Sequence, residues 1–133
     1  MVKRLTAPAL STRKVEHGAA PIVMVTAADY PSARMIGETD ADMILVGDSL
    51  AMVVLGYSDT LSVTIDVMAH HTAAVARANP KQLIVGDLPW MSYHVSIEDT
   101  LRNAAKLVRA GAGAVKLEGG SKHARIAAVV DHI

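Results

Sequence analysis

Hydrophobic residues are grouped along this chain into short runs that alternate with longer amphipathic stretches. The short runs are rich in Val, Ile and Leu and occupy Ile22–Val25, Met43–Val46, Leu83–Val85 and Ala114–Leu117. Between them lie stretches with helical character, roughly Pro31–Glu38, Ile65–Ala78 and Ile97–Ala110, with a further one after Gly120. Continuous apolar strands that alternate with helices are typical of parallel strands covered on both faces. The pattern therefore predicts an α/β fold.

The stretch Ile97–Ala110 carries the strongest helix signals. Ser96 and Asp99 have the spacing of a capping box, and Gly111 is placed to end the helix in a left-handed turn. Between these signals, apolar residues recur at the helical period and form one face: Leu101, Ala104, Ala105 and Val108. We therefore expect an amphipathic helix here.

An acidic residue closely follows three of the four predicted strands. These acids are Asp48, Asp87 and Glu118. Because the carboxyl ends of parallel strands face the ligand site in α/β folds, we expect the three side chains to converge at one rim. Each acid alone is better explained as a cap of the following helix or turn. Three acids in register favour a shared site.

Lys116 places a positive charge inside the fourth predicted strand. The alternation of strand side chains pairs residues on a common face as Val46 with Asp48, Val85 with Asp87, and Lys116 with Glu118. A lysine in a buried strand is costly unless a charge meets it, and an anionic substrate or one of the acids would supply that charge. Carboxylates without His or Cys partners suit a hard cation such as Mg²⁺. The pattern predicts a magnesium site beside Lys116.

Composition narrows the classes of function. The 133 residues are fewer than the ~250 of a typical complete (β/α)8 barrel. Lys plus Arg and Asp plus Glu both number 13, and aromatic residues make up 3%, which disfavours a nucleic-acid partner. The chain has no cysteine, which excludes disulfides and thiolate metal sites.

Hydropathy along the chain predicts no membrane attachment. No window reaches the ~18 consecutive apolar residues of a transmembrane helix. The first residues, Met1–Arg13, lack the apolar core of a secretory signal. We expect a cytoplasmic location.

Four segments resemble, in order and spacing, segments of the ketopantoate hydroxymethyltransferase family. They are Thr26–Ala33, Val46–Tyr57, Gly86–Tyr93 and Val115–Gly120, and the last reads Val-Lys-Leu-Glu-Gly-Gly. The resemblance runs from about Pro21 to the end of the chain. It implies a (β/α)8 TIM barrel, in which residues 21–133 form about the first four of eight β/α units and residues 1–20 form a lead-in.

The resemblance also implies an activity and the residues that serve it. The family transfers a hydroxymethyl group from methylenetetrahydrofolate to 3-methyl-2-oxobutanoate, which gives ketopantoate in pantothenate and coenzyme A biosynthesis. By resemblance, Asp48, Asp87 and Glu118 hold Mg²⁺, and Asp48, Ser49, Asp87 and Lys116 line the substrate pocket. The family's catalytic base is a Glu in the second half of the barrel, and no residue here matches it. The full-length family implies a homo-oligomer.

Several positions depart from the family pattern. Ala28 stands where the family usually has Tyr, Trp90 stands for Phe, Ala51 for Gly and Ser62 for Pro, and Ser58–Asp59 reverses the usual order. None of these changes removes a proposed ligand. Ala28 removes an aromatic hydroxyl near the pocket.

Alternative interpretations stay open at this point. One is a magnesium-dependent oxo-acid lyase or mutase of the phosphoenolpyruvate mutase and isocitrate lyase kind. Another is a non-catalytic half barrel that associates with itself. We also expect that the chain is a truncated form with weak metal binding and little turnover.

His70 and His71 are adjacent on a helix and are not expected to chelate one ion. Gly119–Gly120 forms either an anion-binding nest or a tight turn.

Overall fold

The computed structural model describes residues 4–13 and 18–119, which form a four-stranded parallel sheet with helices on both faces. The strands are β1 (Met24–Thr26), β2 (Met43–Val46), β3 (Leu83–Asp87) and β4 (Ala114–Lys116), in that spatial order. The helices are α1 (Ala7–Ser11), α2 (Tyr30–Gly37), α3 (Leu50–Val53), α4 (Ile65–Arg77) and α5 (Ile97–Arg109). The predicted α/β alternation is confirmed. The helix predicted after Gly120 lies outside the described residues.

Each longer helix begins at a side chain that caps it. Asp29 accepts a hydrogen bond from the Ser32 amide at 2.7 Å at the start of α2. Ser96 accepts one from the Asp99 amide at 3.1 Å at the start of α5, as the capping spacing predicted. Such caps satisfy amides that have no partner inside the helix. After α5, Gly111 has a φ of 112°, which confirms the predicted left-handed turn.

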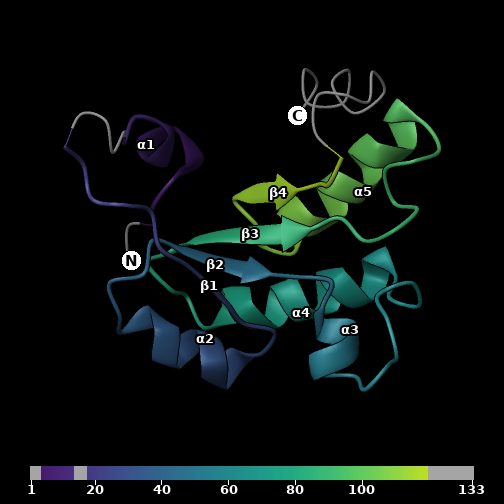
Figure 1. The fold of residues 1–133 in the computed structure, drawn as a ribbon, viewed down its shortest axis with the longest axis horizontal. Coiled ribbons are helices and arrows are strands. Elements are labelled where there is room, and N and C mark those ends of the chain that lie inside the picture. The colour runs from purple at the N-terminus through teal and green to yellow at the C-terminus, as the bar shows by residue number, and fades with distance from the viewer. Residues whose placement is uncertain (1–3, 14–17, 120–133) are drawn as a thin grey trace.

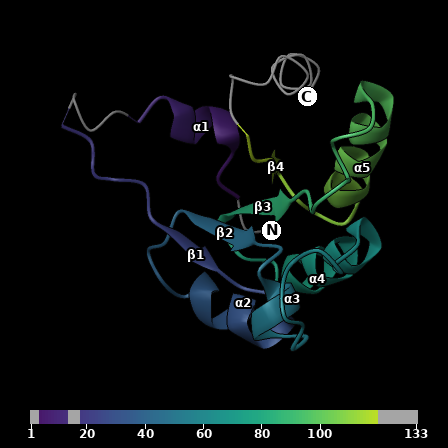
Figure 2. The same ribbon diagram turned by 45° about the vertical axis from the view of Figure 1, so that its right-hand side comes forward.

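The two faces of the sheet have separate cores. Helices α2, α4 and α5 cover one face, where Ile44, Val46 and Ile84 are buried against side chains such as Leu107. Helix α1 lies on the opposite side, as both ribbon views show (Figures 1 and 2). Its Leu10 is 4% exposed and packs with Leu83 and Val85.

The segment predicted as a lead-in therefore contributes to the fold. Burying a leucine such as Leu10 stabilises a protein by about 1.5–3 kcal/mol. Part of the sheet face opposite the main helices is thereby covered. The helix α1 escaped sequence analysis because its five residues are too few to show a period.

Three charged residues hold the amino ends of the strands together. The Arg4 guanidinium donates to the carbonyl oxygens of Pro80, Ala76 and Gly111 at 3.2–3.4 Å. Arg13 forms an ion pair with Asp42, whose other carboxylate oxygen accepts from the Val23 amide at 2.9 Å. These contacts close the end of the sheet opposite the predicted site.

The lengths and hydropathies of the described helices bear on whether any of them could cross a membrane. Within residues 4–13 and 18–119, no helix combines the length and the hydropathy needed to cross a bilayer.

Candidate functional site

The buried carboxylate of Asp87 lies at the centre of the carboxyl rim of the sheet. Its side chain is 3% exposed at the last position of β3. The Lys116 Nζ donates to both of its oxygens, at 2.9 and 2.8 Å, and the Asp48 backbone amide donates to Oδ2 at 3.2 Å. Burial raises the pKa of Asp87, and these hydrogen bonds lower it only in part. The charged form of Asp87 is therefore less stable here than in water.

Lys116 meets two carboxylates instead of lying unpaired in its strand. It is the register partner of Asp87 across β3 and β4, so their side chains share a face. Its Nζ also donates to Glu118 Oε1 at 2.9 Å. Burial acts to lower the pKa of Lys116, but the hydrogen bonds and charges of Asp87 and Glu118 outweigh it and the pKa is raised. The sequence predicted that either an anionic substrate or one of the acids would meet this lysine, and two acids, Asp87 and Glu118, do so in the structure.

The three predicted acids line one cavity of about 250 Å³. Asp48, Asp87 and Glu118 contribute to its wall, and Trp90 and His94 also line it. Within residues 4–13 and 18–119, however, no three acidic, His or Cys side chains are grouped closely enough to hold a metal ion. The Lys116 ammonium lies between Asp87 and Glu118 instead.

Asp48 reaches this cavity by a route that the strand pattern did not predict. The register pairs Val46 with Gly86 and Asp87 with Lys116, so Val46 is on the face opposite Asp87. The predicted common face of Val46 and Asp48 is therefore wrong. Strand β2 ends at Val46, and the following turn redirects the chain, so strict alternation no longer applies.

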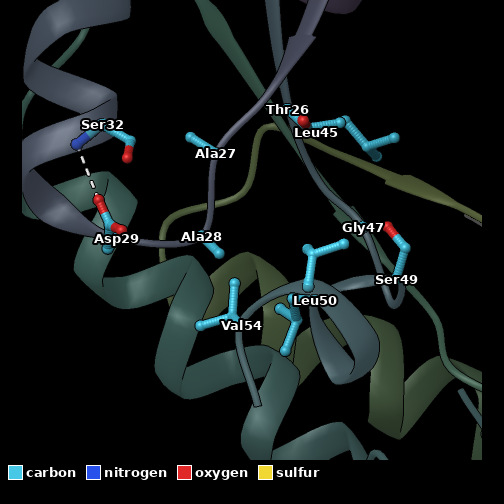
Figure 3. Close-up of a pocket in the computed structure, with 11 residues that line it drawn as sticks. Thr26, Ala27, Ala28, Asp29, Ser32, Leu45, Gly47, Ser49, Leu50 and Val54 are labelled. Atoms are coloured by element: carbon cyan, nitrogen blue, oxygen red, sulfur yellow. Dashed lines mark hydrogen bonds between the residues drawn. The ribbon is translucent and has the colours of Figure 1, made fainter. Parts of the chain in front are cut away.

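Ser49 lines a second cavity of about 190 Å³, which Figure 3 shows. Ala28 and Asp29, which follow β1, also line it, whereas Asp48, Asp87 and Lys116 do not. Ser49 therefore does not share a cavity with Asp48 and Asp87, although it follows Asp48 directly in the chain. Ser49 precedes α3 without a side-chain capping bond, so its hydroxyl is not committed to that helix.

Two residues with contacts at this rim received no role from the sequence pattern. His71 Nδ1 donates to the Ala28 carbonyl at 2.7 Å and so holds the segment after β1. Its ring is nearly perpendicular to that of His70, at 89°. The Tyr93 hydroxyl accepts from the Glu118 amide at 3.3 Å. Both contacts join residues that are 25 or 43 positions apart, which local spacing cannot reveal.

Comparison with known proteins gives one consistent family. The family model described as ketopantoate hydroxymethyltransferase matches residues 4–133. The 3-methyl-2-oxobutanoate hydroxymethyltransferase of Ignicoccus hospitalis is 64% identical over 110 residues, which are 82% of this chain and 42% of that protein. The enzyme of the same name from Moorella thermoacetica is 57% identical over 118 residues, or 88% and 43% of the two chains. This chain therefore spans about two fifths of the length of the curated relatives that it matches.

Solved structures with a similar fold have much lower sequence identity. A 2,3-dimethylmalate lyase of the PEP mutase/isocitrate lyase superfamily aligns with a TM-score of 0.65 and 20% identity, over 96% of this chain and 48% of its own. Oxaloacetate acetylhydrolase aligns with a TM-score of 0.63 and 16% identity, over 88% and 45%. At this identity the likeness concerns the fold alone. It confirms that the described sheet and helices are part of a TIM barrel.

Proposed function

Because the chain belongs to the ketopantoate hydroxymethyltransferase family, we propose that it contributes the metal- and substrate-binding part of an enzyme active site. The reaction is hydroxymethyl transfer from methylenetetrahydrofolate to 3-methyl-2-oxobutanoate, which gives ketopantoate for pantothenate biosynthesis. The observation that carries this proposal is the buried Asp87–Lys116 pair at the carboxyl rim, in a cavity that Asp48 and Glu118 also line.

The residues at this rim fit a magnesium ion bound by few protein ligands. Mg²⁺ usually takes about one or two carboxylates and completes its coordination with waters and substrate oxygens. Asp48 and Asp87 would hold the ion, and Glu118 would complete its surroundings. Asp87 already contacts a cationic group, the Lys116 ammonium, so its position stabilises positive charge. When bound, the ion would polarise the keto group and stabilise the charge that develops as the adjacent carbon loses its proton.

The chain's own residues would bind and orient the oxo acid. The Lys116 ammonium would neutralise the substrate carboxylate, since it is held protonated by its acidic neighbours. The Ser49 hydroxyl would donate a hydrogen bond to a carboxylate oxygen. No residue of the chain matches the family's catalytic Glu. We therefore assign proton abstraction to a segment that the relatives, which are more than twice as long, possess in addition.

Calorimetric titration of 3-methyl-2-oxobutanoate, with and without Mg²⁺, tests this proposal. We expect binding only with Mg²⁺, and at least roughly tenfold weaker binding after Asp48→Asn, because a lost charge-assisted contact costs about 1.5–3 kcal/mol. Asp66→Asn is the matched control, since Asp66 is exposed, pairs with Lys106 and does not line the acidic cavity. Binding of equal affinity without Mg²⁺, or an equal loss in both variants, would refute the assignment.

The shared fold with the lyase superfamily supports a second candidate, which is cleavage or rearrangement of an oxo acid. A product analysis separates the two. Hydroxymethyl transfer consumes the folate donor, whereas a lyase or mutase would convert an oxo acid without it. The family match over residues 4–133 favours the transferase.

The proposal extends to location and assembly. A cytoplasmic homo-oligomer is the form in which we expect this enzyme to act. Sedimentation analysis of the purified chain would test the assembly, and a monomer at all concentrations would contradict it.

A further inference from the structure

An apolar groove of about 300 Å³ adjoins the acidic cavity. The two share Leu61 and Trp90 in their walls, so they are continuous at the rim. Val63 and Met91 also line the groove, and none of its lining residues is charged. Trp90 and Leu61 are 53% and 56% exposed, which leaves a large apolar surface open beside a charged site.

The loop that presents Trp90 is held in one conformation by hydrogen bonds. The Met91 amide donates to His94 Nδ1 at 3.1 Å, and the Ser92 hydroxyl donates to the Pro89 carbonyl at 2.6 Å. The side-chain amide of Asn103, in α5, donates to the Ser92 carbonyl at 2.8 Å. Met91 has a φ of 64°, a conformation that side chains other than glycine rarely adopt and that persists only where the surroundings enforce it. The indole of Trp90 is thus presented on a preorganised support.

We infer that this groove binds the reduced pterin of the one-carbon donor, with its planar pyrimidinone ring stacked on Trp90. The inference rests on the proposed function and adds the place where the donor binds. The groove volume lies at the lower end of the roughly 300–1,000 Å³ typical of ligand pockets, which suits a ring system with the rest of the folate extending out of the groove. Its shared wall with the acidic cavity would bring the edge of the ring beside Asp48 and Asp87.

The chemistry of the lining favours a heteroaromatic ring over an aliphatic chain. The chain has one Trp and no Phe, and its indole is placed at this groove. Offset stacking between aromatic rings adds stability beyond the burial of area. Thr64, Ser92 and Asn103 add hydroxyl and amide groups that can pair with ring nitrogen and oxygen atoms.

The single tryptophan makes the test direct. Titration with 5-formyltetrahydrofolate, a stable reduced folate, should quench Trp90 fluorescence with saturation after correction for absorbed light. The fragment p-aminobenzoylglutamate, which keeps the benzoyl ring but lacks the pterin, should not quench it. By calorimetry, Trp90→Phe should bind the reduced folate within about threefold of the wild type, because an aromatic face is retained, and Trp90→Ala should bind it roughly tenfold more weakly.

Val95→Ala is the matched control. Val95 is a 59% exposed apolar residue of the same connection that does not line the groove, so its truncation should leave folate affinity unchanged. Circular dichroism checks that each variant is folded. An equal loss in Val95→Ala and Trp90→Ala would overturn the inference, as would quenching by p-aminobenzoylglutamate alone. A fluorescence blue shift that depends on protein concentration without ligand would also overturn it, because a second copy would then cover Trp90.

A further variant separates this inference from the proposed function. Asp48→Asn removes a proposed metal ligand outside the groove, so it should weaken Mg²⁺-dependent binding of the oxo acid at least roughly tenfold and leave quenching by 5-formyltetrahydrofolate intact. If oxo-acid binding behaves as proposed but the folate does not quench Trp90, the groove assignment alone fails. If quenching saturates but no Mg²⁺-dependent oxo-acid binding occurs, the groove assignment holds and the metal site fails.

Discussion

Two carboxylates, one at each end of the same parallel sheet, are in opposite circumstances. At the amino end, Asp42 accepts from the Val23 amide and from Arg13, and these hydrogen bonds lower its pKa. At the carboxyl end, burial raises the pKa of Asp87 even though Lys116 contacts both of its oxygens. The fold therefore stabilises one carboxylate as a charge and holds the other at a cost.

The contrast distinguishes a carboxylate that stabilises the fold, Asp42, from one that is suited to bind a ligand, Asp87. A carboxylate with a lowered pKa contributes to folding at neutral pH, whereas one with a raised pKa weakens it. Groups of the second kind gather at sites that bind or react, because another cation can satisfy them there. The strained Met91 and the exposed Trp90 lie at the same end as Asp87. The amino end holds the barrel units together, and the carboxyl end is left open to ligands.

The largest effect on stability should come from Gly111, at the closely packed amino end. A Cβ added there would lie 2.4 Å from Ala76 Cβ, and φ is 112°. Gly111→Ala should therefore lower the free energy of unfolding by about 3 kcal/mol, from backbone strain and overpacking together. Urea denaturation measures this.

Gly56 provides the matched comparison at the open end. It also has a positive φ, 75°, but nothing lies within 4 Å of an added Cβ. Gly56→Ala should cost only about 1 kcal/mol, from the backbone alone. Equal losses in the two variants would contradict the difference in packing between the ends.

Arg4 should have the next largest effect. Arg4→Met removes a charged donor from the carbonyl oxygens of Pro80, Ala76 and Gly111, and should lower the free energy of unfolding by about 2 kcal/mol. Arg102→Met, at an exposed position of α5, should change it by less than about 0.5 kcal/mol. Mg²⁺-dependent oxo-acid affinity should stay unchanged in both folded variants. A loss of affinity in Arg4→Met alone would mean that the two ends are coupled.

The sequence predicted the larger elements and the acidic rim, but not the hydrogen bonds of Arg4 at the amino end of the sheet. The strand runs, the helices and the cap at Ser96 are local signals, and the structure agrees with them. The predicted apolar face of α5 was wrong in part, because Val108 is 54% exposed and the helix buries Thr100, Asn103, Ala104 and Leu107. Arg4 gives no such signal, because its partners are 72 to 107 positions away. Leu10 was missed because α1 is a single short turn of helix.

At the site, the sequence predicted which acids lie together, but it predicted less well how the chain positions their side chains. Asp48, Asp87 and Glu118 do line one cavity, as acids after parallel strands predicted. The face of Asp48 was wrong because a turn, not a strand, positions it. The placement of Ser49 in a neighbouring cavity and the hydrogen bond from His71 to Ala28 depend on tertiary packing, which spacing along the chain does not encode. Whether Asp48, Asp87 and Glu118 hold magnesium stays a prediction.

Asp42 should show a smaller effect that depends on pH. Its folded-state pKa is lowered, so its contribution is present above the unfolded value of about 3.9 and is lost as the pH falls through the folded value. Asp42→Asn should cost about 1 kcal/mol at pH 7, as expected for an ion pair whose Arg13 partner is still partly exposed to solvent, and almost nothing near pH 2. Denaturation at both pH values measures this. If the wild type and Asp42→Asn differed in stability by the same amount at both pH values, the charge of the carboxylate would not be what stabilises the fold.

Asp87 should give the smallest change in stability, with the opposite sign. Its folded-state pKa is raised, so the stabilising form is the protonated one, which is fully present below the unfolded value and lost as the pH rises through the folded value. Asp87→Asn is neutral at every pH and keeps an oxygen that can accept from Lys116. At pH 7 the variant should therefore be at least as stable as the wild type, and it should lose Mg²⁺-dependent binding of the oxo acid. If Asp87→Asn were instead as destabilising as Asp42→Asn, the two ends would not differ, and the Asp87–Lys116 pair would be a structural ion pair.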